Sequence, residues 1–283
     1  MSQPPPSGPT RRRNRLSDKE TEERMLAAAE AMVNETGLTV SLEHLRLEDV
    51  IREAGVARSA VYRRWPYKDL FFSDLLRALA KGGSPADFGS EASRRAILAV
   101  VAERIDELAT PEGRAGVFAE MLRANRDFEH VRESSTWRTY LALHATFLSL
   151  DDGPLRTDVQ AALAETERGF VERIAASHRF LADLLGYRIR PEMGAGFEHL
   201  ATLLNATFRG LLLMAPTVPE LASVPLRARP FGATETADWS QAAMAVAAIE
   251  AAFLEPDPEV EWTPGRIAEV EEAVRRIKDE AGD

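Results

Sequence analysis

The stretch Arg46–Trp65, with the sequence RLEDVIREAGVARSAVYRRW, decides the fold of the first part of this chain. It contains two short helical patterns that are joined by Ala54-Gly55-Val56. Val50, Ile51 and Ala54 recur at the spacing that forms one apolar helix face. Gly55 permits a left-handed turn after that helix, and Val56 fills the angle between the two helices. The stretch therefore predicts a helix-turn-helix.

The second helix of the motif has one polar face. Four polar residues fall at i, i+1, i+4 and i+5, which places them together: Arg58, Ser59, Tyr62 and Arg63. Val61 and Trp65 point the other way, toward the core. Such a helix fits the major groove of B-DNA, where Arg can pair with guanine in a bidentate manner and Ser can bond to either base.

Three further side chains suit contacts with phosphate: those of Tyr62, Arg64 and Lys68. Lys68 falls in the first turn of the next helix, where backbone N–H groups also favour an anion. Ala60 offers only apolar contact with a thymine methyl group. The alternative is a plain helical hairpin with solvated arginines and a half-buried Tyr62.

The motif resembles the TetR family of bacterial transcriptional regulators over residues 18–81. The matching segments are VIREAGV at Val50–Val56, VYRRW at Val61–Trp65 and PYKDLF at Pro66–Phe71. The resemblance implies a three-helix DNA-binding domain, a linking fourth helix, and an all-helical ligand-binding and dimerisation domain. It also implies a repressor that a small molecule releases from DNA. By motif position, the resemblance implies that Tyr62 and Lys68 contact phosphates. It also implies that four residues face the bases: Arg58, Ser59, Ala60 and Arg63.

The chain departs from the family pattern at two helix starts. Arg46 stands where a Thr or Ser usually caps the first motif helix, and Ala57 stands where a Ser usually opens the second. Each missing cap costs about 1 kcal/mol. The join to the preceding helix is also longer than usual, so the first motif helix could begin as early as Ser41.

The N-terminal residues 1–16 are expected to form a disordered basic arm that ends in Arg11, Arg12, Arg13 and Arg15. Such an arm either enters the minor groove or serves as a solubilising tail. Ser17 and Glu20 then form a capping box, and the helix that follows ends at Gly37. The stretch Leu38–Leu45 is either an extended linker or an early helix start.

Charge is distributed unevenly along the 283 residues, which carry a net charge of −10. Residues 1–81 hold 14 basic and 12 acidic side chains, whereas the remainder holds 21 and 33. A nucleic-acid-facing end attached to an acidic body would have this asymmetry, although uneven halves also arise by chance. The chain has no cysteine, no secretory signal and no long apolar run, so we expect a cytoplasmic protein without disulfides.

The whole chain is expected to be all-α. Residues 17–82 would form the helix-turn-helix domain and residues 83–283 a larger helical body, without strands. The helices expected in the body span residues 90–109, 112–126, 128–150, 155–185, 192–214, 237–254 and 263–280. Residues 216–237 are rich in Pro and are expected to form a wrapping loop or a partly mobile one.

Two apolar helix faces are candidates for a dimer interface. They comprise Leu200, Leu203, Leu204, Thr207 and Leu211 on one helix, and Ala243, Val246, Ala247, Ala251 and Leu254 on the other. The alternative is that these faces complete the core of a single chain. A dimer is nevertheless expected, because one helix reads too few base pairs for specificity.

Aromatic side chains and one methionine in the middle of the chain are candidates for a ligand pocket: Phe118, Met121, Trp137, Tyr140, His144, Phe147 and Phe170. Trp137, Tyr140 and His144 share one helical stripe, which could line an apolar cavity. The alternative is that this stripe is ordinary core.

No catalytic, metal or cofactor motif is found, since the five histidines have no metal-binding spacing and no Gly-rich phosphate loop is present. We therefore expect a DNA-binding regulator, most simply a homodimeric repressor of a palindromic operator with a small-molecule effector. The alternative is a helical ligand carrier or protein-interaction module whose helix-turn-helix no longer binds DNA.

Overall fold

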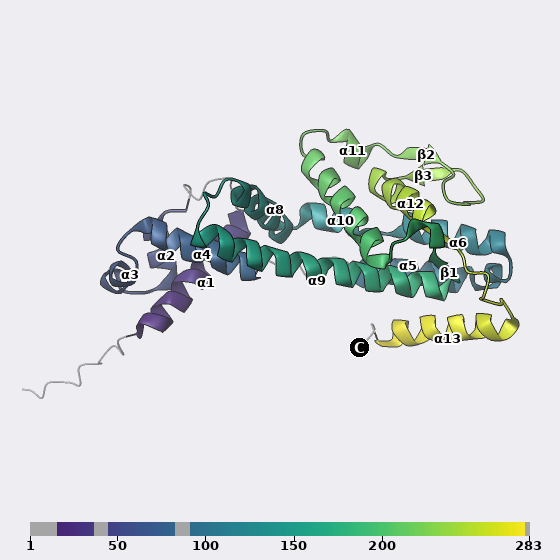
Figure 1. The fold of residues 1–283 in the computed structure, drawn as a ribbon, viewed down its shortest axis with the longest axis horizontal. Coiled ribbons are helices and arrows are strands. Elements are labelled where there is room, and N and C mark those ends of the chain that lie inside the picture. Colours follow the sequence, from purple (N-terminus) through teal and green to yellow (C-terminus); the bar gives the residue numbers. More distant parts are fainter. Residues whose placement is uncertain (1–15, 37–44, 83–90, 281–283) are drawn as a thin grey trace, which may run out of the picture. The chain divides into compact units, whose positions relative to one another are not determined.

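The fold is known from a computed structural model, which describes residues 16–36, 45–82 and 91–280 (Figure 1). The protein is all-α, as predicted, with a few three-residue strands in its described part. It divides into two compact units. Unit 1 comprises Met1–Gly83 and Thr139–Ala162, and unit 2 comprises Ser84–Arg138 and Leu163–Asp283. Helices α8 (Ser135–Leu148) and α9 (Pro154–Leu184) contribute residues to both units.

Unit 1 is built around helix α1 (Asp18–Thr36), which contacts the three helices of the motif region. These are α2 (Leu47–Ala54), α3 (Arg58–Arg64) and α4 (Lys68–Gly82). The core side chains are fully buried and apolar: Met25, Ala29, Val33, Val50, Val61, Trp65, Phe71, Leu75 and Val159. The Trp65 and Phe71 rings pack edge to face, with centroids 5.1 Å apart. This contact joins the end of α3 to α4.

The capping box at the start of α1 is confirmed. The Ser17 backbone N–H donates to Glu20 Oε2 over 2.7 Å, and the Glu20 N–H donates to Ser17 Oγ over 3.1 Å. The bond from the Ser17 backbone also lowers the pKa of Glu20. The basic arm and the stretch around Ser41 lie outside the described residues.

Unit 2 consists of helices with two small antiparallel sheets. Its further helical elements are α5 (Glu91–Glu103), the 3-10 turn η2 (Ile105–Ala109), α6 (Pro111–Ala124), α7 (Asp127–Glu133), the 3-10 turn η3 (Pro191–Met193), α10 (Phe197–Met214), α11 (Glu220–Ser223), α12 (Gln241–Phe253) and α13 (Pro264–Glu280). Strand β1 (Tyr187–Ile189) pairs with β4 (Leu254–Pro256), and β2 (Leu226–Ala228) pairs with β3 (Ala237–Trp239). Figure 1 shows α10 and α12 on one side of the C-terminal part of α9 and α13 on the other.

Several predicted boundaries in unit 2 are wrong, and the expectation that it holds no strands is also wrong. The segment 90–109 is divided into α5 and η2, and the segment 128–150 into α7 and α8. The second division falls at Ser134, whose side chain accepts a bond from the Trp137 N–H at the start of α8. The left-handed Gly194 ends η3, and helix α10 begins at Phe197 after the extended N-cap Gly196.

The expected wrapping loop at residues 216–237 contains helix α11 and strand β2. Its register pairs Leu226 with Trp239, which is fully buried in the core of unit 2. Helix α12 begins after Ser240, whose hydroxyl caps the Ala243 N–H. The pairing of β2 with β3 thus attaches the loop to the core, and the Pro-rich composition did not indicate this pairing. In the described part of the chain, no helix is both long and apolar enough to cross a membrane.

Candidate functional site

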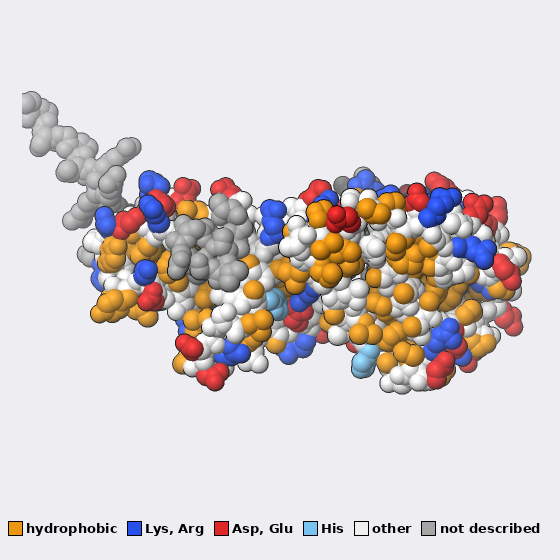
Figure 2. Space-filling view, turned by 90° about the horizontal axis from the view of Figure 1, so that it is seen from above, with side chains coloured by type: hydrophobic (Ala, Val, Ile, Leu, Met, Phe, Trp, Pro, Cys, Tyr) orange, Lys and Arg blue, Asp and Glu red, His pale blue; other side chains and the backbone are white. Residues whose placement is uncertain are grey.

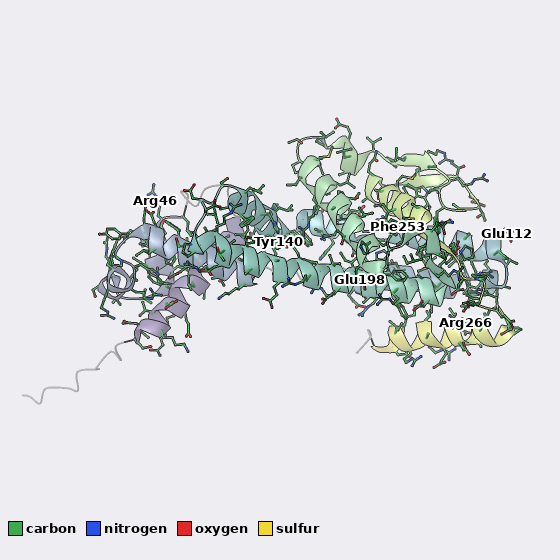
Figure 3. All side chains as sticks on the ribbon, in the orientation of Figure 1. Arg46, Glu112, Tyr140, Glu198, Phe253 and Arg266 are labelled. Carbon is green, nitrogen blue, oxygen red and sulfur yellow. The ribbon has the colours of Figure 1, made fainter. Side chains whose placement is uncertain are left out.

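The turn between α2 and α3 has the backbone that the sequence predicts. Gly55 ends α2 with φ +63°, in the left-handed region where a side chain would be strained. Neither helix start has a side-chain cap: Arg46 precedes α2, where Figure 3 labels it, and Ala57 precedes α3. The two departures from the family pattern are therefore real losses of cap bonds.

Helix α3 separates its buried and exposed faces as the spacing predicts. Val61 is fully buried in the helix and Trp65 is fully buried just after it. The exposed side chains include all but one of the predicted DNA contacts: Arg58, Ser59, Tyr62, Arg63, Arg64 and Lys68. Ala60 is partly buried. The exposed face of α3 is thus polar and cationic, with a tyrosine that is 41% exposed.

Glu48 of α2 binds two of these residues. Its carboxylate accepts a bond from Tyr62 Oη over 2.8 Å and forms an ion pair with the Arg58 guanidinium. The pKa of Arg58 is raised, first by a hydrogen bond with Tyr62 and then by the charge of Glu48. In the free protein, Arg58 and Tyr62 are therefore held to each other and to α2 by one acidic side chain.

The other two arginines of α3 contact helices packed against it. Arg63 pairs with Asp18 at the start of α1. Arg64 Nε donates to Glu22 over 3.1 Å, which raises the pKa of Arg64, and its Nη2 lies 3.4 Å from Asp74 of α4. These pairs are partly exposed, so each adds little to stability. Together they place the cations of α3 beside carboxylates.

Asp74 is the junction of the network on the α4 side. It accepts a bond from the Trp65 indole N–H over 2.9 Å and pairs with Arg77, which also contacts Asp158 of α9 over 2.8 Å. Arg64 therefore helps to attach the end of α3 to its neighbours, in addition to any phosphate contact. No local pattern in the sequence indicates this network, because its members are separated by up to 94 positions along the chain.

Lys68 begins α4 and makes no ion pair with any described residue, so its ammonium group is available to an anion. Tyr67 precedes it and is 73% exposed. Tyr67 belongs to the segment that resembles the family, but its spacing did not mark it as a contact. Two exposed tyrosines and a lysine therefore accompany the arginines of α3.

The face drawn in Figure 2 carries mixed charge, with basic and acidic side chains next to one another and no continuous basic surface. Neighbouring charges of opposite sign weaken the attraction of that face for phosphate.

Unit 2 contains a cavity of about 190 Å³. Its walls are mainly apolar and come from α5, α6, α7, α9, α10, α12 and α13. Of the residues proposed from sequence, Phe118, Met121 and Phe170 line the cavity. A few polar side chains also line it, including those of Arg94, Asp127, Arg173 and His178.

The other four predicted pocket residues do not line this cavity. Trp137 is buried against the Phe170 ring, with centroids 5.4 Å apart. Tyr140, labelled in Figure 3, packs edge to face on His144, and Phe147 lies beneath the guanidinium of Arg156. Trp137 and Tyr140 are buried, as the alternative of ordinary core predicts.

The predicted dimer residues divide into two groups. Five are buried in the core of unit 2 and are not accessible to a second chain: Leu200, Leu204, Ala243, Ala247 and Leu254. Five remain at least partly accessible: Leu203, Thr207, Leu211, Val246 and Ala251. The period of the apolar pattern does not separate a core face from an interface face, since leucines occur on both the buried and the exposed sides of α10.

Further apolar side chains are exposed at the end of α10. Leu213 is 61% exposed and Met214 is 50% exposed, compared with 46% for Leu203. Figure 2 looks down on this side of unit 2, where hydrophobic side chains are gathered. No group of three or more metal-ligating side chains occurs among the described residues.

Comparisons with known proteins add little detail. No protein-family model matches this chain, and no curated protein matches it. Among solved structures, it is similar to one titled "SmeT-Triclosan complex". The two chains are 21% identical, with a TM-score of 0.39, and the match covers 86% of this chain and 99% of the other.

Proposed function

We propose that this protein is a sequence-specific DNA-binding transcriptional regulator, similar to the TetR family. The proposal rests on one observation: the exposed polar face of α3 directly after the left-handed turn at Gly55. An α-helix enters the major groove of B-DNA with such a face. Arg58, Ser59 and Arg63 are the side chains proposed to reach the bases.

The contacts proposed with phosphate come from the ends of this surface. Tyr62, Arg64 and Lys68 have hydroxyl, guanidinium and ammonium donors on exposed side chains, and Tyr67 adds a fourth donor beside them. Such contacts position the protein on the duplex without reading its sequence. The acidic body would be repelled by the same phosphates and stay away from them.

The regulator is proposed to act as a homodimer on a palindromic operator, because two-fold symmetry supplies a second half-site. The exposed apolar residues Leu203, Leu213 and Met214 of α10 are the proposed contact surface. Replacing Leu203 and Leu213 by Glu should convert the dimer to a monomer in light scattering at low micromolar concentration. A wild-type protein that is monomeric in the presence of its operator would contradict the dimer.

The output is proposed to be repression that a small molecule relieves, with the unit 2 cavity as the effector site. The cavity is enclosed by seven helical elements of one unit, and its apolar walls are typical of small-molecule sites. Ligand binding to a helical carrier would use the same kind of cavity, but a carrier would bind no DNA at any salt concentration.

A salt titration separates the regulator from the carrier. Fluorescence anisotropy with a duplex selected from a random library should give a Kd that rises steeply with salt, because each phosphate contact releases counterions. Lys68→Ala should weaken binding to all sequences and reduce the slope of log K against log salt by about 1. Lys81→Ala, which removes the same charge from the far end of α4, is the matched control and should leave the slope unchanged.

A further inference from the structure

A fully buried carboxylate lies beside the unit 2 cavity. Glu250 of α12 is 0% exposed, and its Oε1 contacts Nδ1 of His178 on α9. Within the described part of the chain, neither carboxylate oxygen has a hydrogen bond of good geometry. Burying a carboxylate is costly unless it is paired, so His178 is the group that stabilises Glu250 in this position.

His178 stands between Glu250 and the cavity. His178 lines the cavity and its side chain is 19% exposed, whereas Glu250 does not line it. On α12, Ala243 and Val246 line the cavity, and Glu250 follows them at i+7 and i+4 on the same helix face. Because Nδ1 contacts Glu250, Nε2 is the ring nitrogen that this carboxylate does not engage.

We propose that the cavity binds a compact apolar ligand with one neutral hydrogen-bond acceptor, and that His178, positioned by Glu250, donates its Nε2–H to that acceptor. The His178–Glu250 pair then carries two protons, one between Glu250 Oε1 and His178 Nδ1 and one on Nε2. The proposal rests on the effector site proposed above and specifies the class of effector. An acceptor such as a ketone or ether oxygen has the required chemistry.

The size of the cavity limits the body of the ligand. A cavity of about 150 Å³ lined by aliphatic and aromatic side chains accommodates benzene, so a cavity of about 190 Å³ fits a compound of one or two rings. The apolar walls include Phe118, Phe170 and Phe208, which suit aromatic contacts.

The charges around the cavity favour a neutral ligand. Two lining arginines, Arg94 and Arg173, outnumber the one lining carboxylate, Asp127, and disfavour a cation. The carboxylate of Glu250 behind the imidazole disfavours an anion at the same place. A neutral acceptor avoids both repulsions, and it is the group that an N–H donor in an apolar wall recognises.

The test compares two probes of similar shape on the purified full-length protein, without DNA. These are 2-acetylnaphthalene, which has a carbonyl acceptor, and 2-isopropylnaphthalene, which has none. Isothermal titration calorimetry should give a Kd about tenfold lower for the ketone, which corresponds to one hydrogen bond. Equal Kd values, or no binding of either probe, would overturn the proposal. So would tighter binding of 2-naphthoate than of the ketone.

Variants assign the preference to the histidine. His178→Phe should remove the tenfold preference, whereas His178→Gln, which keeps an N–H donor, should retain part of it. Glu250→Gln should reduce the preference, because the imidazole is no longer oriented, without abolishing binding of the hydrocarbon. A preference that survives His178→Phe would overturn the role of His178, and one unchanged in Glu250→Gln would overturn the positioning role of Glu250.

Thermal unfolding of each variant monitors folding, and the comparison of the two probes on the wild-type protein does not depend on any variant. Because no DNA is present, this experiment can fail while operator binding stands. Operator binding can likewise fail while the probes still bind with the predicted preference.

Discussion

Helix α3 and the unit 2 cavity are assembled in opposite ways. Helix α3 places its exposed polar side chains within seven consecutive residues, and one short turn orients it. The cavity is formed by residues from Ser93 to Ile277, contributed by helices that are far apart in the chain. A surface made by one short helix depends on local spacing, whereas an enclosed space depends on how several helices pack.

The two regions also differ in their electrostatics. Around α3, each of the three arginines is matched by an acidic partner on α1, α2 or α4. Beside the cavity, one buried carboxylate has a single histidine as its partner. Exposed pairs exchange readily with water and other charges, whereas a buried pair remains in place. The α3 surface is therefore adaptable, and the cavity wall is fixed.

Trp65→Ala should have the largest effect and should act through unit 1. Trp65 is fully buried, packs on Phe71, and donates to Asp74, so its loss leaves a large cavity and an unpaired acceptor. We expect a loss of about 3–5 kcal/mol in the free energy of unfolding, measured by urea denaturation. Tyr67→Ala, at an exposed aromatic two positions away, is the control and should change stability by less than about 0.5 kcal/mol. A mild effect of Trp65→Ala would contradict the packing described for α3.

Arg58→Ala should cost about 1–3 kcal/mol in binding to the selected operator and should relax the preference at one base position. The reason is that a bidentate contact with a base is lost, while phosphate contacts remain. Kd values for a set of single-base operator variants provide the measurement. Arg52→Ala is the control, since Arg52 is an exposed arginine of α2 paired with Asp49. An equal loss on every sequence would contradict the assignment of Arg58 as a base-reading residue.

Ala57→Ser should stabilise unit 1 by about 1 kcal/mol, because it supplies the missing cap of α3. The backbone at Ala57 is extended, with φ −74° and ψ 127°, and is ready for a side-chain cap. The midpoint of urea unfolding should rise without a change in its slope. Ala57→Val, which adds bulk without a hydroxyl, is the control. A midpoint that is unchanged by Ser would show that the α3 N-terminus is satisfied in another way.

Glu48→Gln should have the smallest effect of these variants on affinity for DNA, and the direction of the change is informative. It removes the charge that holds Arg58 and Tyr62, and an exposed pair of this kind is worth about 0.2–1 kcal/mol. If these residues must leave Glu48 to reach DNA, affinity should rise by up to about fivefold. Weaker binding would show that Glu48 instead orients Arg58 for the bases. Glu53→Gln, an exposed acid on the same helix, is the control for net charge.

The sequence predicts the region of α3 well because local rules act there. Gly55 specifies the turn, and the spacing of Val61 and Trp65 specifies the buried face, which the structure confirms. The ion pairs of the arginines could not be predicted, because Asp18, Glu22 and Asp74 come next to α3 only through helix packing.

In unit 2, periodicity predicts the long helices but not what their faces contact. The stripe of Trp137, Tyr140 and His144 has the spacing of a pocket wall, yet none of the three lines the unit 2 cavity, and Trp137 packs on Phe170 of α9. Glu250 lies in a largely apolar helix, and only the three-dimensional structure brings it to His178. The position of one helix face relative to another is set by tertiary packing, which a single sequence does not encode in any local pattern.

The central claim is tested most directly by a selection experiment. The purified wild-type protein is mixed with a random library of duplexes, and the duplexes that it retains at moderate salt are sequenced. We predict enrichment of a palindrome whose half-sites lie about one helical turn, or a multiple of one turn, apart. The same selection with Arg58→Ala should show a weaker base preference at one position of each half-site. No enriched motif from a folded, dimeric protein, at both low and moderate salt, would contradict the assignment of α3 as a DNA-reading helix.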